Sequence, residues 1–272
     1  MTVLLGGFFI LLSPISFAQP QKALPQFDHS EWDQFLKAFV SEKGEVDYSS
    51  AQKNQKLLDT YLEKIQSLSG RDFDRWNREE KIALLINTFN ASTVKLVLEN
   101  YPIKSVMDIP SFWDMKAVQL RIFSGEEDKP TAYSLNQIQF DYLRSHYRDE
   151  KILFGLCFAS KTSPRLRQEA FTGPQLEGQL YLATREYVND ETKHRIVPGE
   201  NKIFLSRIFH WYAEDFLVNW SNFPGEVKWK PQEMSVLSFF VHYLDDAPKV
   251  EFLREGKYKV KYEVYDWQLN DA

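Results

Sequence analysis

Apolar residues recur at intervals of three and four along most of this chain, a period that predicts amphipathic helices. Helices are expected over residues 29–41, 57–68, 77–100, 134–143, 176–188, 208–220 and 234–244. The first is marked by Trp32, Phe35 and Phe39, which share one helical face. The third carries the longest stripe, and Asn77 with Glu80 has the spacing of a capping box at its start.

Alternation of apolar and polar residues, which is typical of half-buried strands, is limited to short segments. Strands are expected at 118–122, at 195–197 and 203–205 as a hairpin, and at 258–264. In the last strand Lys257, Lys259 and Lys261 share one face, which favours a protected sheet edge. The apolar run 152–158 is expected to be a fully buried strand. The sequence therefore predicts a predominantly helical α+β domain with a small, mainly antiparallel sheet.

The chain begins with an apolar run over residues 3–12, followed by a Ser13-Pro14 break and small residues at Ser16 and Ala18. This pattern is typical of a secretory signal peptide cleaved near Ala18, and the run is too short to span a bilayer. We expect an exported protein, periplasmic or secreted. Its parts are a signal peptide (1–18), a flexible lead-in (19–28) and a single domain (29–270).

Composition narrows the possible classes of protein. With 43% hydrophobic and 15% aromatic residues, the chain can build a large core. Its net charge of −5 argues against nucleic acid as a partner, because nucleic acids bind basic surfaces. No later apolar run approaches about 18 residues, so no transmembrane span is expected in the mature chain.

The only cysteine, Cys157, lies just before a polar loop in the stretch 151–172. A lone cysteine can be a nucleophile where a base or a cation lowers its pKa. Here Leu156 and Phe158 flank it, and free cysteine commonly behaves as a small buried apolar residue. The structural interpretation is favoured, and the catalytic one stays open.

Several polar residues are candidates for binding. Asn87 and Asn90 share a helix face, and we expect them to tie a neighbouring loop to the helix, with a ligand contact as the alternative. Ser160, Arg165 and Arg167 could bind a carboxylate or phosphate, although a turn followed by solvated arginines is the commoner explanation. The five histidines stand far apart, so neither a metal nor a cofactor is predicted.

Five segments occur in order along the chain: REEKIALLINTFNASTVKLVLENYPIKSVMDI, YSLNQIQFDYLR, ILFGLCFASKTSPRLRQEAFTG, IFHWYAEDF and YDWQLN. Together they resemble the domain-of-unknown-function family numbered 547, over about residues 29–270. The resemblance implies an α+β fold, often as an exported single domain, and no established reaction, substrate or cofactor.

The departures from the family pattern are informative. Members commonly carry one glutamate, two histidines and two cysteines, which are candidates for a metal or Cys–His centre. The matching positions here hold Gln139, Phe140, Leu153, Phe158 and Ser163. Because Phe and Leu can neither bind a metal nor transfer a proton, this joint replacement predicts a degenerate site filled with apolar groups. Positions that keep the family pattern, and are expected to hold the fold or shape a cleft, are Asn87, Asn90, Arg165, Arg167, Trp211 and Asp215.

Three hypotheses follow for the function. The leading one is a non-catalytic binding or scaffold protein that recognises another protein or a small anionic ligand. The second is a hydrolase or acyl-transfer enzyme that uses Cys157 beside a base such as His146 or His210, or a rebuilt site. The third is an anion-binding module built on Arg165 and Arg167.

Overall fold

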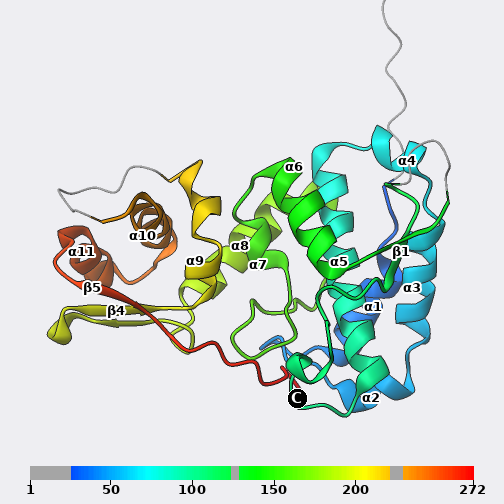
Figure 1. The fold of residues 1–272 in the computed structure, drawn as a ribbon, viewed down its shortest axis with the longest axis horizontal. Coiled ribbons are helices and arrows are strands. Elements are labelled where there is room, and N and C mark those ends of the chain that lie inside the picture. The colour runs from blue at the N-terminus through cyan, green and yellow to red at the C-terminus, as the bar shows by residue number, and fades with distance from the viewer. Residues whose placement is uncertain (1–25, 124–128, 221–228) are drawn as a thin grey trace, which may run out of the picture.

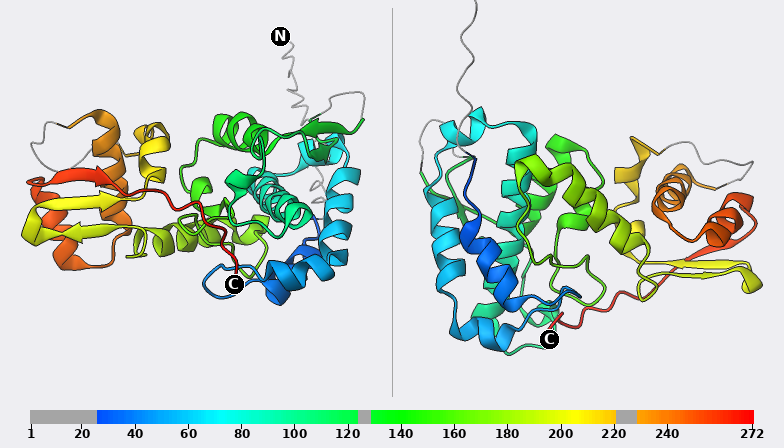
Figure 2. Two further views of the ribbon diagram at one scale, coloured as in Figure 1. Left: turned by 60° about the horizontal axis from the view of Figure 1, so that its bottom comes forward. Right: turned by 180° about the vertical axis from the view of Figure 1, so that it is seen from behind.

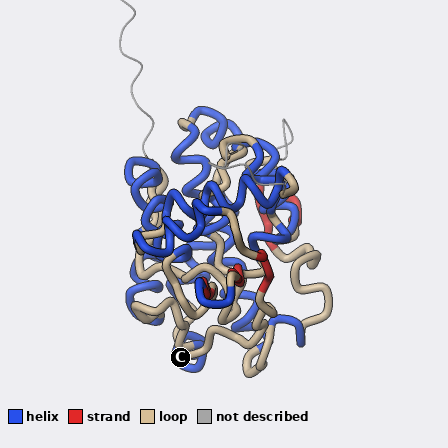
Figure 3. The backbone as a smooth tube through the Cα atoms, turned by 90° about the vertical axis from the view of Figure 1, so that its left-hand side faces the viewer, coloured by secondary structure: helices blue, strands red, loops and turns tan. Residues whose placement is uncertain are grey.

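The computed structural model describes residues 26–123, 129–220 and 229–272. The predicted signal peptide, its cleavage site and most of the predicted lead-in lie outside these residues. Within them, helices dominate and strands are few and short (Figure 3), which confirms the predicted α+β class.

Helix α5 lies among the N-terminal helices at one end of the molecule, and α10 lies beside α11 at the other (Figure 1). The α-helices are α1 (Ser30–Phe39), α2 (Tyr48–Lys53), α3 (Lys56–Ser67), α4 (Gly70–Arg75), α5 (Arg78–Asn100), α6 (Ser145–Tyr147), α7 (Ile152–Gly155), α8 (Leu176–Val188), α9 (Ile208–Trp211), α10 (Pro231–Tyr243) and α11 (Ala247–Glu255). A π-helix covers Gln137–Arg144, and 3-10 turns cover Val106–Asp108, Gly173–Gln175, Pro198–Glu200 and Ala213–Leu217. Helices α2, α4 and α11 were not predicted, and the helix expected over 208–220 is broken into α9 and a 3-10 turn.

Helix α5 is the core of the N-terminal half and is buried on nearly all sides. By length and composition it could cross a membrane, but 89% of its most apolar window is buried, as is usual for a core helix. The Asn77 side chain caps its first turn by accepting from the Glu80 backbone N–H at 2.8 Å. Only half of the predicted capping box forms, because the Glu80 carboxylate instead accepts from the Phe27 N–H, also at 2.8 Å.

The strands form two small sheets. Strands β1 (Val118–Leu120) and β2 (Thr131–Tyr133) are an antiparallel pair. The second sheet has the order β3-β4-β5 and contains the predicted hairpin of β3 (Arg195–Val197) and β4 (Lys202–Leu205). Strand β5 (Lys259–Tyr262) pairs in parallel with β4 at the sheet edge, with its lysines exposed, as the alternation predicted.

The apolar run 152–158 is not a strand, and this prediction is wrong. Its first four residues form the single turn α7, which packs against α8, and the rest is an irregular buried segment. A Cβ on Gly155 would lie only 3.1 Å from Leu180 Cδ2 and 3.2 Å from Phe171 Cζ, so the turn is enclosed on several sides. Periodicity alone cannot distinguish such a turn from a buried strand.

The last residues of the chain run back from β5 across the molecule to the N-terminal helices (Figure 2). Single bridges join this C-terminal segment (263–272) to three distant places, pairing Gln268 with Ser105, Leu269 with Ser160, and Asp271 with Val46. The C-terminal segment therefore holds the two ends of the elongated molecule together.

Candidate functional site: an aromatic pocket

A pocket of about 230 Å³ lies where the helical half, α9 and the C-terminal segment meet. Seven of its ten lining residues are aromatic. The lining consists of Trp113, Asn136, Gln139, Phe140, Phe158, Ile208, Trp211, Tyr212, Tyr265 and Trp267. We refer to this set as the aromatic pocket. Because none of these side chains carries a formal charge, the pocket is an apolar site in a charged protein surface.

The rings come from separate segments and make two groups. In one, Tyr212 stands nearly parallel to Phe140 and to Phe158, with interplanar angles of 11° and 18°. In the other, Trp267 stacks with Trp211 at a centroid distance of 5.9 Å. Trp113 links the groups, since its centroid is 5.7 Å from that of Phe158 and 6.3 Å from that of Trp267.

Hydrogen bonds to their hydroxyls fix two tyrosine rings of the lining. Gln139 Nε2 donates to the Tyr212 hydroxyl at 2.8 Å, and the Tyr265 hydroxyl is 2.8 Å from Ser160 Oγ. Burial is the main cause that raises the pKa of both Tyr212 and Tyr265. These phenols are therefore neutral at physiological pH and position their rings.

An ion pair supports the outer side of the Phe140 and Tyr212 rings. Arg144 donates two hydrogen bonds to the Asp215 carboxylate, at 2.7 and 2.5 Å. Its guanidinium carbon lies 4.7 Å from the Phe140 ring centroid and 4.8 Å from that of Tyr212. Asp215, which the sequence marked as a candidate binding residue, therefore orients the Arg144 guanidinium against the wall of the pocket.

Three of the five positions predicted as a degenerate site meet in the aromatic pocket: Gln139, Phe140 and Phe158. Leu153 and Ser163 are not part of the lining. Leu153 is buried in α7, and the buried Ser163 Oγ accepts from the Phe158 N–H at 2.7 Å. Ser163 thus holds the backbone that carries one of the rings.

Cys157 is buried and lies outside the aromatic pocket. The amide of Asn270 donates to its sulfur at 3.8 Å, and burial is the main cause that raises the pKa of its thiol. Neither of the bases considered from the sequence is hydrogen-bonded to it. His146 is exposed and hydrogen-bonded to Asp141 O, and the ring of the exposed His210 packs on Tyr262.

Asn87 and Asn90 are buried and bind loop backbone, as the structural interpretation predicted. Asn87 donates to Phe171 O at 2.7 Å and accepts from Phe171 N at 3.0 Å. Asn90 donates to Gly155 O at 2.9 Å and accepts from Cys157 N at 2.8 Å. Both side chains therefore replace the backbone partners that these buried loops lack.

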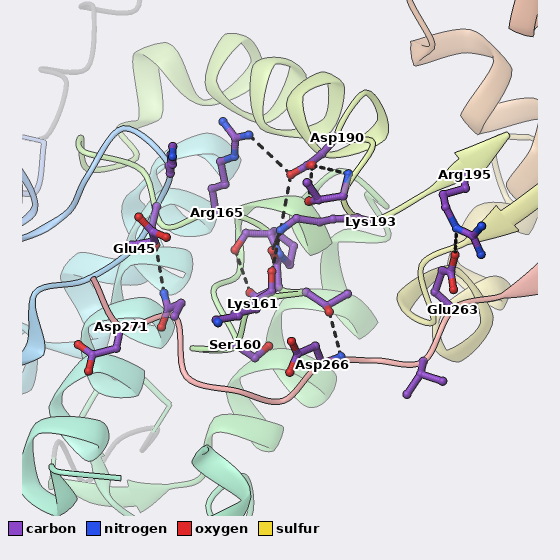
Figure 4. A pocket seen from close by; sticks show the side chains of 18 residues that line it. Glu45, Ser160, Lys161, Arg165, Asp190, Lys193, Arg195, Glu263, Asp266 and Asp271 are labelled. Atoms are coloured by element: carbon purple, nitrogen blue, oxygen red, sulfur yellow. Dashed lines mark hydrogen bonds and ion pairs between the residues drawn. The ribbon is translucent and has the colours of Figure 1, made fainter. Parts of the chain in front are cut away.

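Ser160 and Arg165 line a second, polar cavity of about 780 Å³ (Figure 4). Two of its cations are directed at the Asp190 carboxylate. Arg165 is 3.6 Å from Asp190, and the buried Lys193 lies 3.8 Å from the same carboxylate while donating to Ser163 O at 2.6 Å. Burial is the main cause that lowers the pKa of Lys193. The polar cavity is therefore largely neutralised by its own side chains.

The predicted Arg165/Arg167 pair does not face one ligand position as two free cations. The Arg167 guanidinium is largely buried and lies 2.8 Å from Glu169 and 3.5 Å from Glu186. Both arginines line a third, shallow cavity of about 450 Å³, which also includes these two glutamates. Each arginine thus has a carboxylate partner within the protein.

Sequence reasoning did not single out Trp113, Tyr265 or Trp267 as site residues. The available signals were weak. Tyr265 and Trp267 are two residues apart in an extended segment, so they lie on one side of it, while Asp266 between them lines the polar cavity. The C-terminal segment is thus the wall between the two cavities.

Within residues 26–123, 129–220 and 229–272, no group of three or more His, Cys, Asp or Glu side chains is placed to hold a metal ion. The chain matches no curated protein and no solved structure. Residues 73–188 match the model of a family described as "Protein of unknown function, DUF547".

Proposed function

We propose that the protein is an exported, non-catalytic binding protein whose ligand site is the aromatic pocket. One observation carries the proposal. Phe140 and Phe158, at positions where the resembled family carries histidine and cysteine, are both walls of this pocket. The rings line a pocket instead of filling it completely, so the replacement supports a change from a reactive site to an apolar binding site.

The chemistry of the lining supports binding over catalysis. Its polar side chains are amides and neutral phenols, and two of them are already hydrogen-bonded to each other. None is a general base near neutral pH, and the thiol of Cys157 is buried elsewhere with a raised pKa. An apolar cavity with a few polar groups is the usual form of a small-ligand site.

We further infer that the family relationship extends beyond the matched residues 73–188. The segments IFHWYAEDF and YDWQLN, which resemble the family, supply Trp211, Tyr212, Tyr265 and Trp267 to the same pocket. On this proposal the domain runs over residues 29–270, follows a signal peptide and has no membrane span.

The test uses the purified chain 19–272 with ¹⁵N-labelled tryptophan and a panel of small probes: choline, 3,3-dimethyl-1-butanol, indole and methyl glucoside. At about 10 mM, at least one probe should shift the indole signals of Trp113, Trp211 and Trp267 while leaving the buried core residue Trp32 unchanged. Trp211→Ala should abolish the shifts at Trp113 and Trp267.

Tyr181→Ala is the matched control, because Tyr181 is 44% exposed and Trp211 46%, and Tyr181 lies outside the pocket. Binding that survives Trp211→Ala, or the failure of every probe, would contradict the proposed site. Stoichiometric metal in elemental analysis of the purified protein would contradict a non-catalytic role.

A further inference from the structure

Several polar side chains of the aromatic pocket are already hydrogen-bonded within the protein, which disfavours a hydroxyl-rich ligand such as a sugar. The Tyr265 hydroxyl is bound to Ser160, and the Gln139 amide donates to Tyr212. The amide nitrogen of Asn136 donates to Asp114 at 2.8 Å. A sugar would bury several hydroxyl groups against a lining that is mostly aromatic ring, and each hydroxyl left without a partner weakens binding.

The rings themselves provide a different kind of recognition. Aromatic faces are electrically negative and attract cations placed over them, most strongly where water is excluded. This attraction is already used at the outer wall, where the Arg144 guanidinium lies against Phe140 and Tyr212. The other rings of the lining offer a group of indoles and a phenol at mutual centroid distances of 4.4–5.9 Å.

The charge near the pocket also favours a cation. Asp114 lies one hydrogen bond behind the lining residue Asn136, and within the described residues it has no ion-pair partner. Lys116, two residues further along, donates to the side chain of Gln137, the neighbour of Asn136. The Asp114 carboxylate therefore places a negative charge one hydrogen bond behind the lining, with the Lys116 ammonium also nearby.

We propose that the aromatic pocket binds a quaternary ammonium group, as part of a small ligand with a trimethylammonium head. Such a head needs no hydrogen-bond partner, and its charge is spread over methyl groups that pack against ring faces. A primary ammonium would bury N–H donors with few acceptors, so it should bind more weakly. The volume of about 230 Å³ is below that of drug-sized ligand sites and suits a small head group.

This inference rests on the proposed function, and the experiment separates the two. Choline is titrated against its neutral isostere 3,3-dimethyl-1-butanol at constant ionic strength, with the indole signals of Trp113 and Trp267 as the readout. Choline should bind at least about tenfold more tightly, since the two differ only in the charge of the head. Trp211→Ala should remove this difference, and Tyr181→Ala should keep it.

Asp114→Asn adds a readout that packing alone would not change. It should weaken choline binding about two- to threefold and leave the isostere unaffected. If the isostere binds as tightly as choline, or methyl glucoside binds better, the quaternary ammonium proposal is overturned while the binding function stands. If no probe binds, both are overturned.

Discussion

Removing the Asn90 side chain gives a direct test of how the segment before Phe158 is held. Asn90 is 2% exposed, and its amide satisfies both Gly155 O and Cys157 N–H, at 2.9 and 2.8 Å. In Asn90→Ala these two buried backbone groups lose their partners. Each costs about 1–3 kcal/mol, so we expect the free energy of unfolding to fall by about 2–6 kcal/mol. That is a large share of the usual 5–15 kcal/mol.

Asn100→Ala is the matched control on the same helix. The Asn100 side chain donates only to Leu96 O within α5, and the residue is exposed. Its loss should change stability by no more than about 0.5 kcal/mol, because Ala also has the higher helix propensity. Urea unfolding followed by circular dichroism and tryptophan fluorescence measures both variants, with the m-value as a check on two-state behaviour.

A loss below about 1 kcal/mol in Asn90→Ala, or one equal to that of Asn100→Ala, would refute the reasoning. Asn90→Asp sharpens the test. It keeps the acceptor for Cys157 N–H but places a second acceptor, charged at neutral pH, against Gly155 O. It should destabilise at pH 7 at least as much as Ala, and recover part of the loss when the carboxyl is protonated at low pH.

Three further predictions concern other parts of the molecule. Cys157 should resist a thiol reagent at pH 7 until the protein is denatured, because burial shields it and raises the pKa of its thiol; rapid labelling of the native protein would favour the enzyme hypothesis instead. Burial lowers the pKa of His29 to about 4 and that of His194 to about 3. Because the unfolded chain protonates these histidines near pH 6.5 and the folded chain does not, the free energy of unfolding should fall as the pH drops from about 6.5 to 4 for His29 and to 3 for His194. His29→Gln should reduce this loss of unfolding free energy by about 3 kcal/mol. If urea unfolding shows the same pH dependence in the variant and the wild type, His29 is not a cause of the loss. Asn270→Ala should lower the melting temperature and weaken probe binding at Trp267, because Asn270 anchors the C-terminal segment to Tyr48 and Gly44; binding at the wild-type level would show that this anchor does not position the ring.

Much of the helical framework could be predicted because long periodic stripes identify amphipathic or core helices. The short turn α7 could not, because residues 152–155 are buried on several sides and their run of apolar residues has no period that favours helix or strand. Helix α5 shows the opposite case. Its two asparagines interrupt an apolar stripe, and the hydrogen bonds expected from that interruption are the ones formed with Phe171, Gly155 and Cys157.

The pocket was less accessible to prediction than the fold. Gln139, Phe140 and Phe158, at positions that the resemblance marks as substituted, predicted a site filled with apolar groups. The pocket found there instead depends on rings from elsewhere in the chain. Sequence spacing does not report that Trp113 approaches Trp267, which lies more than 150 residues away. Only the path of the C-terminal segment across the molecule brings them together.

That path bears on what the family match means. Residues 73–188 contribute Trp113, Phe140 and Phe158, while Trp211 and Trp267 come from outside the match. The proposed replacement of a histidine and a cysteine by phenylalanine within the matched segment would on its own leave two exposed apolar rings. In the whole chain Phe158 is buried and Phe140 stays 38% exposed, so apolar surface is buried without closing the site. A fragment ending at residue 188 should therefore lose the pocket as well as stability, and the two halves of the lining are best understood as one site.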